Sequence, residues 1–97
     1  MSNDNYDGDD LFAFEEDDPL KAAVAELHEI SRDNLLQKNV KLKIENCLKI
    51  MNDESKDISI RVNKVSVILD EICEDSNIES FSRTRLYNVA QLLEKVC

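Results

Sequence analysis

Glycine and proline are almost absent from the 97-residue chain, which contains one residue of each and no tryptophan. Glycine and proline form most tight turns, and a β-rich domain of this size needs many turns, so their scarcity argues against a β-rich fold. It also excludes a glycine-rich phosphate-binding loop, which needs several closely spaced glycines. The abundant Leu, Ile, Glu and Lys are typical of a few helices joined by short polar loops.

Long apolar runs are absent as well, because no stretch approaches the roughly 18 residues that a membrane-spanning helix needs. The N-terminus is acidic where a secretory signal peptide would be basic and then apolar. Cys47, Cys73 and Cys97 are odd in number and widely spaced, so we do not expect a disulfide framework. Reduced thiols fit a cytosolic protein, and we expect a cytoplasmic location without membrane contact.

The net charge of -9 is concentrated at one end of the chain. Residues 1–18 contain eight acidic residues and no basic ones, whereas residues 19–97 contain thirteen acidic and twelve basic residues. A segment with so much like charge and so little apolar surface does not fold alone. We therefore expect a disordered acidic tail over 1–18 and a folded body over 19–97. The body is nearly neutral and has no general attraction for nucleic acid.

Apolar residues at intervals of three or four define four helical segments in the body. Asp18 is a suitable N-cap and Pro19 a suitable first residue for the first helix. We predict turns over 31–34 and 75–77, with a central linker over 52–56. The apolar faces, in chain order, are Leu20, Ala23, Val24, Leu27 and Ile30; Leu36, Val40, Ile44, Cys47, Leu48 and Met51; Ile58, Val62, Val65, Leu69 and Ile72; and Leu86, Val89, Ala90, Leu93 and Val96.

The two halves of the body resemble each other. A shift of 42 residues makes Leu27, Glu29, Ile30 and Asp33 coincide with Leu69, Glu71, Ile72 and Asp75. Two helical hairpins related by an internal repeat predict an all-α fold, an up-and-down four-helix bundle. Phe81, at the start of the last helix, is expected to pack as an anchor for the turn before it.

No pattern of catalytic or metal-ligating residues emerges, so we expect no enzyme, cofactor or metal site. His28 is the only histidine, and a general base needs a partner and a pocket. The three cysteines lack the closely spaced pairs of structural zinc sites, and Cys47 falls on an apolar face. The carboxylates within residues 70–75 are interpreted as a solvated helix end, with a weak divalent-cation site as the alternative.

The acidic tail holds the best candidate for function, an apolar and aromatic island from Leu11 to Phe14. Such a segment suits folding upon binding to a groove of another protein, with its acids steering the encounter and Phe12 and Phe14 as anchors. The alternative is a solubilising extension whose aromatic residues cover a seam of the bundle. We expect an accessory or adaptor module in which Leu11, Phe12 and Phe14 engage a larger protein or ribonucleoprotein.

A basic face is the second candidate, because the repeat relates Lys41 and Lys43 to Arg83 and Arg85. Such a face could bind nucleic acid or a partner's acidic segment, with the protein's own tail competing for it. Exposed lysines that only keep the helices soluble are the plainer alternative. A homodimer is a further option, because a body of this size buries only about 60–65% of its unfolded surface.

The second half of the chain resembles a known family of small archaeal proteins, catalogued only as an uncharacterised protein family. The residues that carry the resemblance are 57–62, 68–72, Asp75, Asn77, 83–88 and 93–94. Ser76 and Glu79 stand where the family tends to have prolines, and Tyr87 stands where it often has tryptophan. The resemblance implies a compact up-and-down four-helix bundle, and it implies no particular activity.

Overall fold

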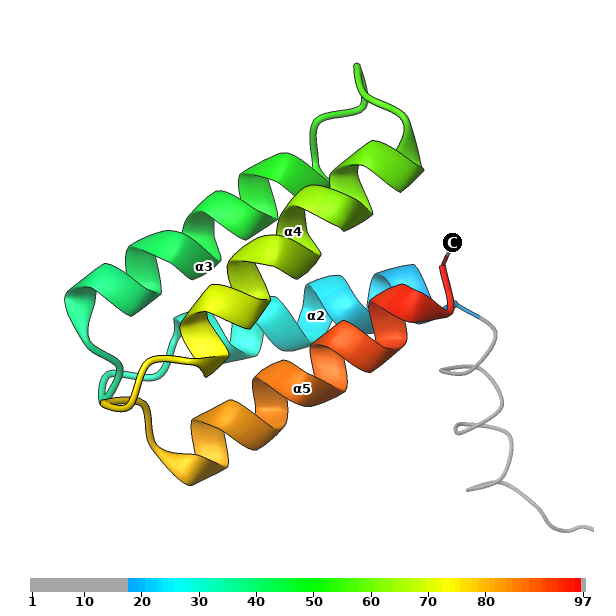
Figure 1. Ribbon diagram of the computed structural model, residues 1–97. Helices are drawn as coiled ribbons and strands as arrows, with labels where there is room; N and C mark the ends of the chain where they lie inside the picture. Colours follow the sequence, from blue (N-terminus) through cyan, green and yellow to red (C-terminus); the bar gives the residue numbers. More distant parts are fainter. Residues whose placement is uncertain (1–17, 97) are drawn as a thin grey trace, which may run out of the picture.

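The computed structural model describes residues 18–96, and within this range the chain forms four α-helices and no strand. The helices are α2 (Pro19–Ser31), α3 (Lys38–Met51), α4 (Ile58–Cys73) and α5 (Ser80–Glu94). Consecutive helices run in opposite directions (Figure 1). Helices α3 and α5 both pack against α2 and against α4, whereas the diagonal pairs in this part of the chain do not meet. The predicted all-α, up-and-down four-helix bundle is confirmed.

Helix α2 begins where the sequence predicts. The Asp18 carboxylate accepts a hydrogen bond from the backbone N–H of Lys21 at 3.1 Å, and Pro19 occupies the first helical position. The cap satisfies one of the N–H groups that the first turn leaves without a partner. The start of the next helix differs from the prediction. Leu36, which we expected in the second helix, lies in the loop 32–37, and α3 begins only at Lys38.

The three loops, 32–37, 52–57 and 74–79, share one conformation. In each loop the second residue is an aspartate whose Oδ1 accepts the backbone N–H two residues later, at 2.9 Å for Asp33, 3.1 Å for Asp53 and 2.9 Å for Asp75. Its carbonyl oxygen also accepts the N–H three residues later, at 3.2 Å in every case. Aspartate forms such turns with its own side chain, which explains how the chain turns without glycine or proline.

The middle loop carries an additional hydrogen bond, from the hydroxyl of Ser55 to Asp53. This bond, and then the one from the Ser55 backbone, lowers the pKa of Asp53 below its usual value. The stabilisation is therefore present above the pKa of the unfolded chain and is lost as the pH falls through the folded pKa. We expect Ser55→Ala to raise the pKa of Asp53, as measured by NMR titration of its carboxyl carbon. Ser55→Thr keeps the hydroxyl and should keep the low pKa, and equal titration curves for the Ala and Thr variants would contradict the assignment.

Arginine side chains close the C-terminal ends of two helices. Arg61, in the first turn of α4, donates to the carbonyl oxygen of Met51, the last residue of α3, at 2.8 Å and to that of Lys56 at 3.0 Å. The last carbonyl groups of a helix have no partner within it, so these bonds satisfy groups that would otherwise depend on water. Arg83 occupies the equivalent place in α5. Each arginine stands eight residues after the aspartate of the preceding loop.

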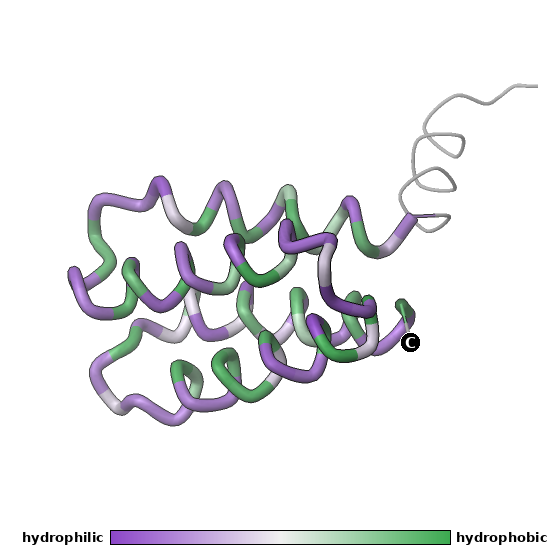
Figure 2. The backbone as a smooth tube through the Cα atoms, turned by 90° about the horizontal axis from the view of Figure 1, so that it is seen from above, coloured by the Kyte–Doolittle hydropathy of each residue, from purple (hydrophilic) through white to green (hydrophobic). Residues whose placement is uncertain are grey.

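The core runs through the centre of all four helices, and hydrophobic positions recur along each of them (Figure 2). Cys47 and Cys73 belong to this core. Burial raises the pKa of the Cys47 thiol to about 12. Burial, followed by the nearby charge of Asp70, also raises the pKa of Cys73. Both thiols therefore stay protonated at neutral pH, and a protonated thiol is a poor nucleophile and a poor metal ligand.

Candidate functional site

Two of the three loops meet at one end of the bundle, where 32–37 and 74–79 lie side by side (Figure 1). Residues of both loops, including Leu35, Leu36 and Ile78, line one small cavity of about 30 Å³. The loop 52–57 and the start of α2 lie at the other end of the bundle. We call residues 32–37 and 74–79, together with Phe81, the loop end.

The loop end exposes large apolar side chains. Leu35 is 79% exposed and Phe81 is 68% exposed. The prediction that Phe81 anchors the turn is therefore wrong, and the buried positions beside that turn belong to Ile78 and Ser82. The reason is geometric, because neighbouring residues of a helix point about 100° apart, and Ser82 takes the core-facing direction. Leu35 is a candidate interaction residue that the apolar pattern of the sequence did not indicate.

The Phe81 side chain is held in place although it is exposed. The Arg85 guanidinium lies over its ring, 5.8 Å from the ring centroid, and Arg85 Nε donates to Glu26 Oε2 of α2 at 2.8 Å. The hydrogen bond to Glu26 raises the pKa of Arg85 further above its usual value. An arginine over an aromatic face is attracted to the ring quadrupole. Phe81 is thus connected to α2 through a charged side chain that orders it.

The two loops of the loop end carry more acidic than basic residues. They contain one basic residue, Arg32, against the four acidic residues Asp33, Glu74, Asp75 and Glu79. Asp33 and Asp75 hold the turns with their side chains, while Glu74 and Glu79 are exposed. Leu35 and Phe81 therefore share this end of the bundle with the exposed carboxylates of Glu74 and Glu79, and the cations of Arg83 and Arg85 lie there as well.

The four residues of the predicted basic face have different surroundings. Arg83 donates to the carbonyl oxygens of Cys73 and Asp75, both at 3.0 Å, and Arg85 pairs with Glu26. Lys41 and Lys43 belong to α3, which does not meet α5 across the described bundle. Both arginines are therefore engaged within the bundle, and the two lysines lie on the helix diagonal to α5. The tail residues Leu11, Phe12 and Phe14 lie outside the described residues, as does Cys97.

The residues considered for catalysis or metal binding are spread apart. His28 is exposed on α2, as expected for a surface histidine, whereas Cys47 is in the core. Residues 18–96 contain no group of three or more His, Cys, Asp or Glu side chains arranged to hold a metal ion. No helix in this range is long and apolar enough to cross a membrane.

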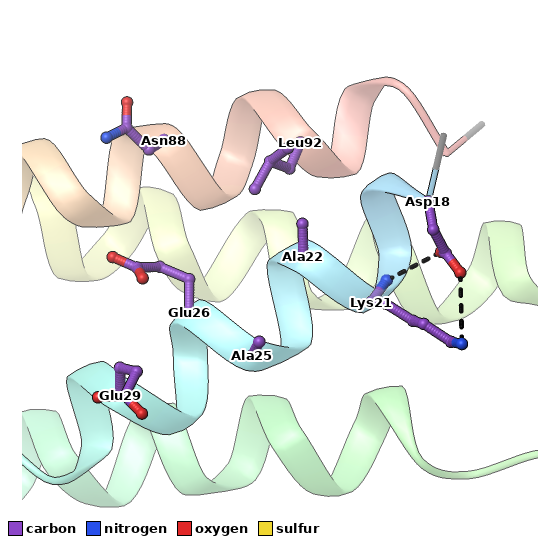
Figure 3. A pocket seen from close by; sticks show the side chains of 8 residues that line it. All are labelled: Asp18, Lys21, Ala22, Ala25, Glu26, Glu29, Asn88 and Leu92. Atoms are coloured by element: carbon purple, nitrogen blue, oxygen red, sulfur yellow. Dashed lines mark hydrogen bonds and ion pairs between the residues drawn. The ribbon is translucent and has the colours of Figure 1, made fainter. Parts of the chain in front are cut away.

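Two grooves flank α2 along most of its length. One groove, between α2 and α5, has a volume of about 530 Å³ and is lined on its apolar side by Ala22, Ala25 and Leu92 (Figure 3). Three carboxylates, those of Asp18, Glu26 and Glu29, and one ammonium group, that of Lys21, also line it, and we call it the acidic groove. The other groove, of about 580 Å³, lies where α2 meets the loop 52–57.

A sequence signal for the loop conformation exists, although comparing only the two halves does not reveal it. Asp33, Asp53 and Asp75 are each followed eight residues later by a basic residue, which is Lys41, Arg61 or Arg83. The 42-residue shift aligns the first loop with the third, and it aligns the second loop with neither of them. A comparison of all three loops would have indicated that the arginines have a structural role.

Comparison with known proteins identifies relatives of the whole bundle. A model of the uncharacterised protein family UPF0147 matches residues 9–96. A UPF0147 protein from Thermococcus kodakarensis is 31% identical over 68 residues, which are 70% of this chain and 82% of that protein. Another, from Methanothermobacter thermautotrophicus, is 33% identical over 70 residues, which are 72% of this chain and 69% of that protein.

The fold is also found in a solved structure. The crystal structure of a protein from uncharacterized family UPF0147 from Thermoplasma acidophilum matches with a TM-score of 0.80 at 26% identity. The match covers 84% of this chain and 96% of that chain. These findings confirm the resemblance to an uncharacterised archaeal family and the helical-bundle fold, and the names of the relatives state no activity.

Proposed function

This chain belongs to the uncharacterised protein family UPF0147, and we propose that it is a cytoplasmic protein-interaction module without catalytic activity. In this proposal the loop end binds a larger protein, alone or within a ribonucleoprotein. The observation that carries the proposal is the exposure of Leu35 and Phe81 at one end of the bundle, beside buried neighbours that complete the core without them.

The chemistry of the loop end defines the partner. Aromatic side chains that enter a pocket of the partner supply much of the energy of a protein interface. Phe81 is suited to this role because Arg85 and Glu26 already order it, so binding costs less side-chain entropy. The exposed Glu74 and Glu79 favour a partner that presents basic side chains beside an apolar pocket.

The tail supplies a second contact in this proposal. Leu11, Phe12 and Phe14 lie outside the described residues, and their role rests on the sequence alone. The eight acids of the tail have the same sign as Glu74 and Glu79, so both groups would be attracted to one basic partner. Nucleic acid is disfavoured at the loop end by the same charges, and Arg83 and Arg85 donate within the bundle.

The proposal is tested with the double variant Leu35→Ser/Phe81→Ser. Both side chains are exposed, so the stability of the fold should change by no more than about 0.5 kcal/mol each. The full-length protein and the variant are immobilised, and proteins recovered from nuclease-treated cell extract are quantified by mass spectrometry. We expect a protein whose recovery falls about tenfold or more, the equivalent of roughly 1.4 kcal/mol.

The matched control is Ile60→Ser, because Ile60 is also exposed but lies in the first turn of α4, beside the loop 52–57 at the other end of the bundle. It should recover the same protein in full. Equal recovery by all three proteins would remove the loop end from the proposal. Recovery that is seen only in a parallel extract without nuclease treatment would instead support the nucleic-acid alternative.

A further inference from the structure

The second groove beside α2 combines an apolar floor with positive charge. Leu20, Val24 and Met51 line it on the apolar side. Its charged side chains are those of Lys21, Arg61 and Glu54, and the exposed imidazole of His28 lies at its far end along α2. We call it the basic groove.

The basic groove starts next to the point where the tail joins the bundle. Asp18 caps α2, and Leu20 and Lys21 follow within the first turn of the helix. The groove extends along α2 from Leu20 to His28, a distance of about 12 Å at 1.5 Å per helical residue. An extended chain covers about 3.3 Å per residue, so residues 14–17 span about 13 Å and reach its full length.

Charge distinguishes the two grooves as sites for the tail. The residues Glu15, Glu16 and Asp17 directly precede α2. In the acidic groove the carboxylates of Asp18, Glu26 and Glu29 already pair with Lys21, Arg85 and Arg32, so none of these cations is left for the tail. In the basic groove Lys21 pairs with Asp18, whereas Arg61 donates to backbone carbonyl oxygens and forms no ion pair within residues 18–96, so its charge remains beside the single carboxylate of Glu54. Opposite charges at such short range attract, and salt weakens the attraction where they are exposed.

We propose that in the free protein the tail folds back into the basic groove, with Phe12 or Phe14 on the apolar floor and Glu15–Asp17 beside Arg61. The tail then runs antiparallel to α2 and covers apolar side chains that the bundle leaves partly open. The contact is intramolecular, so the short connection through Asp18 gives the island a high effective concentration at the groove. A partner of the tail would have to displace this contact. The inference does not depend on the loop end.

The test is NMR spectroscopy of the full-length chain at low salt. The expected result is nuclear Overhauser effects between a phenyl ring of Phe12 or Phe14 and the methyl groups of Val24 or Met51, unchanged on dilution. The double variant Phe12→Ser/Phe14→Ser should abolish these effects and shift the amide signals of α2 along the basic groove. Tyr6→Ser, outside the island, is the matched control and should leave them in place.

Charge reversal provides a second measurement that leaves the aromatic residues untouched. Lys21→Glu removes a positive charge from the exposed rim of the groove, so the effects at Val24 should weaken severalfold, as they should at high salt. Three results would overturn the proposal. The first is that the amide signals of α2 along the basic groove do not change in the double variant. The second is that the phenyl rings give nuclear Overhauser effects to Leu92 of the acidic groove. The third is that the nuclear Overhauser effects vanish on dilution, which would identify a second copy as the occupant.

Discussion

Replacing Leu86 by alanine is expected to lower the free energy of unfolding by about 3 kcal/mol. Leu86 has no exposed surface and lies on α5 among the buried side chains of the core. Removing its terminal carbons loses their burial and leaves a cavity, because close-packed neighbours relax only partly. For a body of this size the whole stability is on the order of 4–12 kcal/mol, so the loss is a large fraction of it.

Urea denaturation measures this effect through the midpoint of the transition at constant slope. The matched control is Leu42→Ala, because Leu42 is 56% exposed on α3. That change should lower the free energy of unfolding by no more than about 0.5 kcal/mol. Similar losses for the two variants would mean that position 86 is not a core position and that the helix is rotated.

The sequence predicted the helices because their buried residues follow one period. Val65, Leu69 and Ile72 are spaced four and three residues apart, and all three are buried in α4. The start of α2 was also predictable, because Asp18 and Pro19 act locally through one hydrogen bond and one fixed backbone angle. These features need only neighbouring residues, so no knowledge of the tertiary structure was required.

The loop end was not predictable from the apolar pattern, because helical periodicity stops where the helix stops. Leu36 was assigned to a helix and lies in a loop, while Phe81 was expected to pack as an anchor for the turn and is exposed. The residue buried beside the last turn is Ile78, three positions earlier. Which apolar residue enters the core depends on the loop conformation, and Asp75 sets that conformation with its own side chain.

The basic residues show a second limit of the sequence. A lysine or arginine at the edge of a helix suits a solvated surface, a nucleic-acid contact or a cap, and its residue type does not distinguish these roles. Arg83 acts as a cap because the loop 74–79 brings carbonyl oxygens to its side chain, and Arg85 is paired because Glu26 faces it from α2. Both facts depend on the path of the chain between helices.

Replacing Arg83 by methionine is expected to lower the free energy of unfolding by about 2 kcal/mol. The guanidinium donates to three carbonyl oxygens, those of Cys73 and Asp75 at 3.0 Å and that of Ile78 at 3.4 Å. Hydrogen bonds from a charged donor contribute about 1.5–3 kcal/mol, and buried acceptors that lose their donor cost more. The site is half-buried, so water replaces part of the loss and keeps the total near the lower end of that range.

Two control variants separate the hydrogen bonds from the charge and from the alkyl chain. Arg83→Lys keeps the charge but lacks the planar fork that reaches several carbonyls at once, so its loss should lie between zero and that of Arg83→Met. Lys41→Met changes the equivalent position after the first loop, where the structure gives no such bond within residues 18–96, and should cost about 0.5 kcal/mol or less. Equal losses at positions 41 and 83 would contradict the capping role.

The same variant tests whether the cap also shapes the loop end. The amides of Asn77 and Ile78 bond to Asp75, and Arg83 fixes the carbonyl groups on both sides of that turn. Without the guanidinium this loop should open more often, and the two amides should exchange with solvent faster than the amides of the loop 52–57. Because Phe81 lies two residues after this loop, a loosened turn would also let the Phe81 ring occupy a wider range of positions. An interaction through Phe81 would then weaken in Arg83→Met even though the ring itself is unchanged.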